Sequence, residues 1–317
     1  MVVKIHKILH TFGMVVRDIL DIFKTRLAKG GFFCYNTGMK PVIKYQGGKT
    51  KELPLIKQLA PKTFDRIVEP FCGGGAVALH YGDTCVLNDI NEAVINLYRE
   101  IGSDNYPIIQ RRIDEIKTFD HDMLEDVYYT SRDIINNPKN HSTTDYAIAY
   151  IVVRQLCFSG MERYNSEGKF NVPFGHYKKM SCNLSPEHHN FFSKKATVSI
   201  ADAINVIGVC TENDFIFIDP PYIDRLGYTT GDGGGKLHLR LVDAMKKTSA
   251  KWLLIHSDCE FYREMLKDYH IFTKEFKYKQ NFGKGKDHSG SQVQHLYITN
   301  YETVTSDDTN NIMLATI

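Results

Sequence analysis

The segment Asp219-Pro220-Pro221-Tyr222 follows directly after a wholly apolar run, Phe215 to Ile218. Such a run is typical of a strand in a parallel sheet covered on both faces, and these sheets bind ligands beyond the carboxyl ends of their strands. Proline has a fixed φ and no N–H, so the Pro220 carbonyl can face a pocket beside the Asp219 carboxylate. The two groups could accept both N–H bonds of a planar amino group, with Tyr222 stacked on its ring. An ordinary turn after a strand has the same composition, so this segment needs support from other motifs.

A glycine-rich segment upstream, Glu69-Pro70-Phe71-Cys72-Gly73-Gly74-Gly75, offers that support. Residues 66–69 predict a strand and residues 76–81 the start of a helix, so the glycines form a turn at which a ligand can approach the backbone closely. Gly73, Gly75 and Ala78 also satisfy the GxGxxA pattern of dinucleotide-binding turns. The pattern alone does not separate a nicotinamide cofactor from S-adenosylmethionine, and a plain tight turn is the alternative.

Two further segments carry polar groups suited to a cofactor. Asp89 follows the apolar run 85–87, where a carboxylate would accept hydrogen bonds from ribose hydroxyls. The alternative role is helix capping, which Asn91 could perform for a helix predicted at 93–100 while Asp89 remains a ligand. The turn Lys44-Tyr45-Gln46-Gly47-Gly48-Lys49 could bring an ammonium group to a cofactor carboxylate, or could be a basic surface turn.

The elements that must position these residues alternate between strand and helix. Short apolar runs predict strands, and helical patterns between them indicate a doubly wound, Rossmann-like α/β sheet. Residues 105–195 interrupt this alternation, because they are rich in Tyr, Asn, His and charge. They contain one apolar helix candidate, 146–156, and a turn-rich stretch, 158–177. We therefore expect an inserted subdomain, mostly helical, between the two halves of the sheet.

Composition indicates an ordinary globular protein. The chain has 317 residues, 43% hydrophobic and 24% charged, which excludes a collagen-like or disordered chain. No apolar run is long enough for a transmembrane helix, and no signal peptide is recognisable. Seven scattered cysteines without a CxxC pair argue against a disulfide framework and favour a reduced, cytoplasmic compartment. His6 and His10 have metal-ligand spacing but no third ligand nearby, so we expect no metal.

The net charge of +2 does not exclude a nucleic-acid partner, because basic charge can be local. Residues 1–40 carry seven Lys/Arg against two Asp/Glu, and residues 163–195 carry six against two. A helical pattern at 14–28 could form a basic arm, although we favour a docking helix. The second basic stretch suits phosphate contacts by Lys178, Lys179, Lys194 and Lys195.

Along the chain, the turn Lys44 to Lys49 comes first, followed by the glycine-rich segment, Asp89, the insert and Asp219 to Tyr222. These motifs and their order resemble the Dam-like family of DNA adenine-N6 methyltransferases over about residues 40–302. Within the insert, Arg163-Tyr164-Asn165 and Phe170-Asn171-Val172-Pro173-Phe174-Gly175-His176-Tyr177 resemble the family's DNA-reading hairpin. His295 to Tyr301 resembles its closing strand. The resemblance implies a Rossmann-like methyltransferase sheet with an inserted, mostly helical plus β-hairpin target-recognition domain.

The resemblance also implies roles for individual residues. Asp219, Pro220 and Tyr222 match the catalytic motif. The positions that match the S-adenosylmethionine pocket are Tyr45, Lys49, Glu69, Phe71, Gly73, Asp89 and Asp202, with Ala203 where the family usually has Phe. The positions that match DNA contacts are Lys44, Met161, Arg163, Pro173, Tyr177 and Lys178. Of these, Lys44 and Arg163 would read guanine, and Ser159 stands where Asn is common. Arg163 could instead pair with Glu162 or Glu167.

We therefore expect a site-specific enzyme that transfers a methyl group from S-adenosylmethionine to N6 of an adenine flipped out of duplex DNA, with GATC as the leading target. The alternatives are an RNA or other amino-group methyltransferase, or a catalytically silent DNA-binding module; nothing supports a hydride-transferring oxidoreductase. Expected partners are duplex DNA and, if one exists, a cognate restriction endonuclease acting separately. No membrane is expected, and the chain would be a monomer or weak dimer.

The expected organisation has four parts. These are an N-terminal extension, 1–38; a catalytic domain, 39–104 with 196–302; a target-recognition domain, 105–195; and a loose tail, 303–317. The glycine-rich loop 227–235 would be a flap over the flipped base or a loose surface loop. The basic loop 274–286 would touch the DNA backbone or be a solvated hairpin.

Overall fold

The computed structural model describes residues 38–223, 235–278, 291–303 and 313–314. The predictions for the helix at 14–28 and the His6/His10 pair lie outside these residues. Most of the glycine-rich loop, the basic loop and the tail also lie outside them. Within the described part of the chain, no helix combines the length and the apolar character needed to span a membrane.

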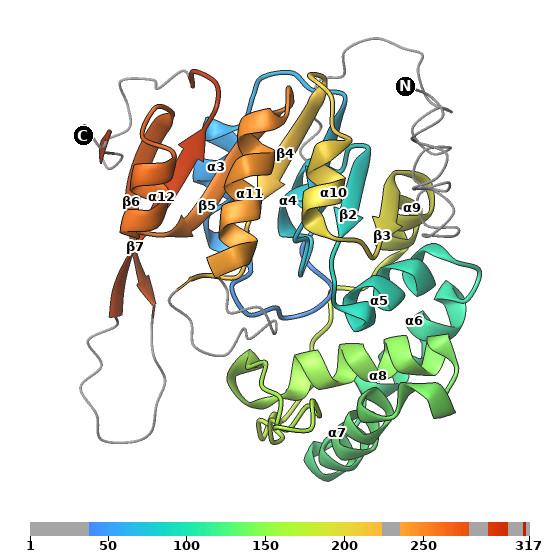
Figure 1. Ribbon diagram of the computed structural model, residues 1–317. Helices are drawn as coiled ribbons and strands as arrows, with labels where there is room; N and C mark the ends of the chain where they lie inside the picture. The colour runs from blue at the N-terminus through green and yellow to red at the C-terminus, as the bar shows by residue number, and fades with distance from the viewer. Residues whose placement is uncertain (1–37, 224–234, 279–290, 304–312, 315–317) are drawn as a thin grey trace. The chain divides into compact units, whose positions relative to one another are not determined.

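Eight strands of the described chain form one mixed sheet in the order β3-β2-β1-β4-β5-β7-β6-β8 (Figure 1). The parallel strands are β1 (Arg66–Glu69), β2 (Cys85–Asn88), β3 (Ala196–Ser199), β4 (Asp214–Ile218) and β5 (Lys251–Ser257). The antiparallel ones are β6 (His270–Tyr278), β7 (Ser291–Thr299) and β8 (Met313–Leu314). This is the Rossmann-like α/β sheet that the apolar runs predict.

Both faces of the sheet are buried, which explains why its central strands are wholly apolar. In β4, Phe215 and Phe217 pack into one hydrophobic cluster, and Ile216 and Ile218 pack into the other. Alternate side chains of a strand point to opposite faces, so each face needs its own apolar set. The first cluster includes α3 (Leu53–Leu59), α4 (Ala76–Tyr81) and α5 (Glu92–Gly102), and the second includes α10 (Ala203–Gly208), α11 (Gly235–Lys247) and α12 (Glu260–Met265).

In the sheet, β1 lies between β2, which is the next strand along the chain, and β4. The strand order therefore reverses at β1, and the carboxyl ends of β1 and β4 lie together at the same edge of the sheet. A crevice outside such a reversal is where open α/β sheets bind ligands.

The segment between β2 and β3 is mostly helical, as predicted. Its helices after α5 are α6 (Tyr106–Ile116), α7 (His121–Asn136), α8 (Thr143–Leu156) and α9 (Pro186–Lys194), with the short 3₁₀ helices η2 (Pro138–Asn140) and η3 (Phe158–Gly160) between them. A further short 3₁₀ helix, η1 (Lys49–Lys51), precedes α3. Helix α8 packs against α5 and α7. Asp120 and Ser142 cap α7 and α8 through their side chains, which fixes where each helix begins.

The predicted recognition hairpin differs from a regular ladder. Between α8 and α9 the described pairing consists of two isolated bridges, Cys157 with Phe174 and Tyr164 with Phe170. Ser159 adopts the left-handed conformation, with φ 54°. Asn, the residue that the resemblance implies at this position, tolerates that conformation better than most residues.

Candidate active site

A cavity of about 840 Å³ lies at the carboxyl ends of β1 and β4. This volume falls within the usual range for small-molecule sites. Every residue predicted for the cofactor and for catalysis lines the cavity: Tyr45, Lys49, Glu69, Phe71, Gly73, Asp89, Asp202, Asp219, Pro220 and Tyr222. The fold thus brings together motifs that are far apart in the sequence.

The Asp219 carboxylate faces the Lys49 ammonium across 2.6 Å, and both side chains are largely buried. Lys49 Nζ also donates to the Gly47 carbonyl at 2.7 Å. Burial raises the pKa of Asp219, and the Lys49 ammonium opposes that rise. The sequence analysis predicted that the Lys49 ammonium contacts a cofactor carboxylate, whereas in the structure it contacts the Asp219 carboxylate.

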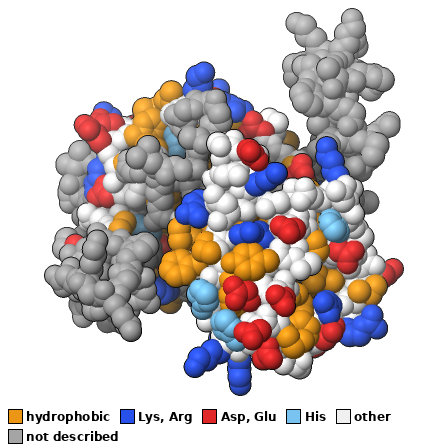
Figure 2. Space-filling view, turned by 90° about the horizontal axis from the view of Figure 1, so that it is seen from below, with side chains coloured by type: hydrophobic (Ala, Val, Ile, Leu, Met, Phe, Trp, Pro, Cys, Tyr) orange, Lys and Arg blue, Asp and Glu red, His pale blue; other side chains and the backbone are white. Residues whose placement is uncertain are grey.

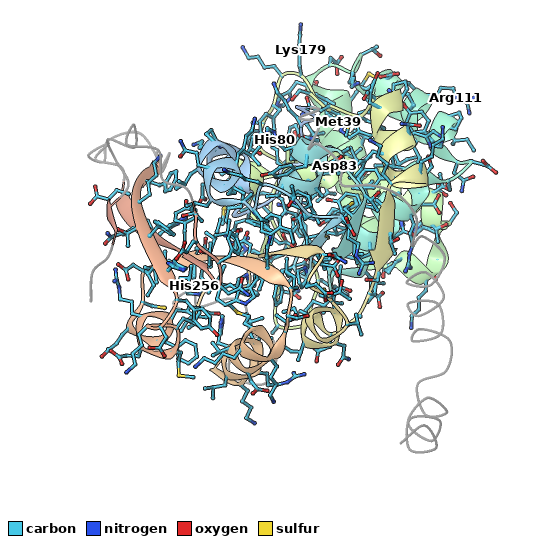
Figure 3. The ribbon with its side chains drawn as sticks, turned by 90° about the horizontal axis from the view of Figure 1, so that it is seen from above. Met39, His80, Asp83, Arg111, Lys179 and His256 are labelled. Atoms are coloured by element: carbon cyan, nitrogen blue, oxygen red, sulfur yellow. The ribbon has the colours of Figure 1, made fainter. Side chains whose placement is uncertain are left out.

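Tyr222 lies against two histidines that the sequence reasoning missed. Its ring centroid is 4.6 Å from that of His256 on β5 and 5.7 Å from that of His295 on β7. Figure 3 shows His256 between the sheet and the layer of α11 and α12. A signal was available in the sequence, since His256 follows the apolar run 252–255 directly, as Asp219 follows its own.

His256 holds the backbone at the end of the Asp219–Tyr222 segment. Its Nε2 accepts a hydrogen bond from the Ile223 N–H at 3.1 Å, and its Nδ1 therefore donates to the Ser257 carbonyl at 2.7 Å. Burial lowers the pKa of His256 to about 4. The imidazole is consequently neutral at physiological pH, which keeps Nε2 available as an acceptor.

Hydrogen bonds with two neighbouring side chains hold the glycine-rich turn at Gly73. Gly73 donates its N–H to the Asp89 carboxylate at 2.9 Å, and its carbonyl accepts from the Tyr98 hydroxyl at 2.6 Å. Asp89 also accepts from the Asn91 N–H, and the Asn91 side chain accepts from the Ala93 N–H. We predicted that Asn91 caps the following helix while Asp89 remains a ligand. The cap is confirmed, since Asn91 caps α5.

Replacing Gly73 with Ala is expected to lower the free energy of unfolding by about 2–4 kcal/mol. Gly73 has φ +44°, and a Cβ there would lie 2.6 Å from Cε1 of the Tyr45 ring. Urea unfolding measures the change. Gly168→Ala is the matched control, because Gly168 has φ +73° with nothing within 4 Å of an added Cβ. Equal losses in the two variants would mean that the contact with Tyr45 is unimportant.

Glu69 is buried beside Asp219 and accepts the Ala78 N–H at 2.7 Å. Burial raises the pKa of Glu69 from 4.5 to about 8. Between these two values the folded chain keeps a proton that the unfolded chain has lost, so the free energy of unfolding is expected to fall as pH rises through this window. Glu69→Gln should flatten that slope, measured by urea unfolding at several pH values, whereas the exposed Glu264→Gln should leave it unchanged.

Asp202 caps the N-terminus of α10, where its side chain accepts the Ile204 N–H at 3.0 Å. Its other oxygen pairs with Arg240 of α11, and both residues line the cavity together with Ala203. The sequence reasoning missed Arg240, because nothing in the pattern of α11 indicates that it faces Asp202.

Comparison with known proteins places this arrangement in a family. Residues 45–280 match the model of the D12 class N6 adenine-specific DNA methyltransferases. The chain belongs to this family. It is 33% identical over 274 residues to the type II methyltransferase M.CviBI of Paramecium bursaria Chlorella virus NC1A, covering 83% of this chain and 100% of the relative. It is 28% identical to the DNA adenine methylase of Haemophilus influenzae, over 71% and 82% of the two chains, and 32% identical to that of Escherichia coli K12, over 57% and 64%.

The D12-class enzyme acts on DNA, and its predicted DNA-binding residues do not all lie at the cavity. Lys44 lines the cavity, donates to the Gln155 carbonyl at 2.7 Å and lies 4.2 Å from the centre of the Tyr177 ring. Burial lowers the pKa of Lys44. The other five lie outside the lining: Met161, Arg163, Pro173, Tyr177 and Lys178.

Arg163 of this methyltransferase is exposed and is oriented by Asn171. Its Nε donates to Asn171 Oδ1 at 2.8 Å, and its terminal nitrogen donates to the Asn171 carbonyl at 3.1 Å. The alternative partners are engaged elsewhere, since Glu162 lies near Arg154 and Glu167 near Lys169. Lys178 and Lys179 are also exposed, and Figure 3 shows Lys179 projecting from the periphery.

Arg154 is a further residue that the sequence reasoning missed. It is fully buried on α8 and donates to the carbonyls of Lys44, Gly160 and Met161 at 3.0–3.1 Å. One side chain thus holds the turn at the cavity next to the start of the segment between α8 and α9, which was predicted to recognise DNA and is called the recognition segment below.

Proposed function

We propose that this methyltransferase transfers the methyl group of S-adenosylmethionine to N6 of an adenine that has been flipped out of duplex DNA. One observation carries the proposal. The Asp219 carboxylate lies at the carboxyl end of β4, inside the cavity that the predicted cofactor residues line. A hydrogen-bond acceptor for the adenine amino group would therefore stand next to the methyl donor.

The residues that line the cavity fit S-adenosylmethionine. The cofactor carries a sulfonium and an ammonium cation as well as two ribose hydroxyls, and the cavity presents the carboxyl groups of Glu69, Asp89 and Asp202. Asp89 and Asp202 would accept hydrogen bonds from the nucleoside part, and Tyr45 would pack against it. When bound, the cofactor supplies an electrophilic methyl group.

The chain's own residues would activate the amino nitrogen by positioning and electrostatics. The nitrogen lone pair is delocalised into the adenine ring, which makes it a poor nucleophile. Hydrogen bonds to Asp219 and the Pro220 carbonyl would localise the lone pair and stabilise the positive charge that develops on nitrogen. Tyr222 would stack on the ring, and the proton would leave to water after the transfer.

The depth of the site supports base flipping. The Asp219 side chain has only 19% of its surface exposed. An adenine amino group paired inside a duplex cannot reach a carboxylate at such a depth, so the base must leave the stack.

GATC is the proposed target. The exposed guanidinium of Arg163 can present a fork to guanine O6 and N7, the pairing that reads this base best. Names of relatives favour a role in restriction and modification, because M.CviBI is described as a type II methyltransferase.

Transfer of labelled methyl groups to matched duplexes tests the proposal. The duplexes share one composition and differ in whether they contain GATC. Incorporation at N6 of adenine in the GATC duplex alone, lost in Asp219→Ala, is the expected result. Equal incorporation into both duplexes would contradict the target, and preferential labelling of an RNA of the same sequence would contradict the DNA substrate.

A further inference from the structure

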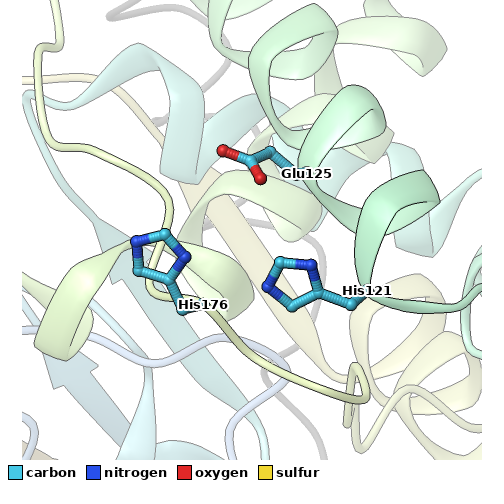
Figure 4. A group of neighbouring side chains, drawn as sticks. All are labelled: His121, Glu125 and His176. Atoms are coloured by element: carbon cyan, nitrogen blue, oxygen red, sulfur yellow. The ribbon is translucent and has the colours of Figure 1, made fainter.

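Three potential metal ligands from two separate segments meet outside the active site. His121 and Glu125 stand one turn apart on α7, and His176 belongs to the recognition segment between α8 and α9. Their ligand atoms lie within 4.8 Å of one another. Figure 4 shows the two imidazoles facing each other, with the Glu125 carboxylate to one side of the space between them.

We propose that His121, Glu125 and His176 bind one divalent transition-metal ion, with zinc as the first candidate. Two imidazoles and one carboxylate form a three-residue donor set of the kind that holds zinc with its fourth position open to water. Two histidines favour first-row transition metals over magnesium and calcium, which prefer oxygen ligands.

The backbone around the three ligands is fixed before any metal binds. The buried ring of Phe174 packs edge-on against both imidazoles, at centroid distances of 5.5 Å from His121 and 5.6 Å from His176. The Tyr128 hydroxyl of α7 donates to the Val172 carbonyl at 2.7 Å. Helix and recognition segment are therefore held in register, and the entropy cost of assembling the site is small.

The two rings are already nearly parallel, with an interplanar angle of 8° and centroids 6.0 Å apart. Ligand atoms in a tetrahedral zinc site lie about 3.3 Å apart, from Zn–N distances of about 2.0–2.1 Å. The ligand atoms must therefore draw together slightly around the ion. His176 can make that movement, because its side chain is exposed.

A carboxylate orients the first histidine. His121 Nδ1 lies 3.1 Å from Asp122 Oδ1, so this nitrogen carries the proton and Nε2 keeps its lone pair for a metal. Ligating histidines almost always donate their second N–H in this way. Histidine and acidic side chains gather on the face of the molecule seen in Figure 2. His176 is exposed and His121 and Glu125 are half-buried, so an ion can reach these ligands from solvent.

The proposal departs from the sequence-based expectation of no metal. That expectation rested on His6 and His10, which lie outside the described residues. The four-residue spacing of His121 and Glu125 was the available signal, but the helix that carries them was not predicted, and the third ligand lies 51 residues after Glu125. A bound ion would link α7 to the recognition segment and stabilise their contact.

Calorimetric titration of the EDTA-treated full-length protein with zinc tests the site directly. The expected result is one saturable site per chain whose affinity falls more than about tenfold in His121→Ala and in His176→Gly. Glycine is chosen at 176 because His176 has φ 53°, which glycine adopts without strain. Cobalt should give a visible d–d absorption band that is lost in the same two variants.

Two control variants should keep the wild-type affinity. His141→Ala removes an exposed histidine from the same part of the chain. The double variant His6→Ala/His10→Ala removes the histidine pair that the sequence analysis singled out for its spacing. Thermal unfolding in EDTA checks that every variant folds. Wild-type zinc affinity in His176→Gly, or the absence of a saturable site in the wild-type protein, would overturn the proposal.

Discussion

Asp219→Asn is expected to lower the single-turnover rate of methyl transfer by about 10²–10³-fold, while cofactor affinity stays close to that of the wild type. Attack by the amino nitrogen places positive charge on it, and the Asp219 carboxylate would stabilise that charge. Asparagine keeps the size and an acceptor oxygen but loses the negative charge. The substitution also removes the counter-ion of the buried Lys49 ammonium, which lies 2.6 Å from the Asp219 carboxylate in the wild-type protein.

Rapid-quench measurement at saturating DNA and cofactor separates this chemical effect from binding. Asp202→Asn is the matched control, since Asp202 lines the same cavity and is paired with Arg240. That variant should raise the KM for the cofactor with little change in the single-turnover rate. A full rate in Asp219→Asn would mean that the carboxylate has no role in the chemical step.

Arg154→Ala is expected to lower the free energy of unfolding by about 3–5 kcal/mol. The substitution leaves three carbonyl groups without their donor and the largely buried Glu162 carboxylate without the guanidinium 3.6 Å away. Buried polar groups that lose their partners cost more than the original interaction contributed. Urea unfolding followed by circular dichroism measures the loss.

Two variants define the cause. Arg99→Ala removes an exposed arginine from α5 and should change stability by less than about 0.5 kcal/mol. Arg154→Lys keeps the charge but not the planar fork that reaches three acceptors, so an intermediate loss is expected. A loss in Arg154→Ala no larger than in Arg99→Ala would show that the buried network contributes little.

The sheet was predictable from sequence because its central strands are buried on both faces. That burial leaves runs such as Phe215 to Ile218, which no polar residue interrupts. The position of the cavity was also predictable, because three of its lining motifs directly follow strands: Pro70 to Gly75 after β1, Asp89 after β2, and Asp219 to Tyr222 after β4. Long-range side-chain contacts were not. The pairing of Lys49 with Asp219 joins residues whose separation carries no periodic signal, so the sequence assigned Lys49 to the cofactor.

The supporting residues were missed for a related reason. Arg154 lies in the apolar helix candidate 146–156, and a charged residue inside such a helix signals a buried polar network, but it does not identify the partners. His256 and Arg240 act through the backbone or through another side chain, so neither belongs to a recognisable motif. The family resemblance implied a hairpin in the recognition segment, and the described pairing consists of two isolated bridges.

The position of β1 between β2 and β4 has a consequence for synthesis on the ribosome. Arg66 of β1 pairs with Asp214 of β4, and these residues are 148 positions apart. The strands β1 and β2 therefore leave the ribosome long before their partners β4 and β3. The outer edges of β1 and β2 stay unpaired until the helical insert has been translated. Helices form from local contacts and fold quickly, whereas parallel pairing at this separation is slow. The nascent chain should consequently need protection from edge-to-edge aggregation until β3 and β4 have left the exit tunnel.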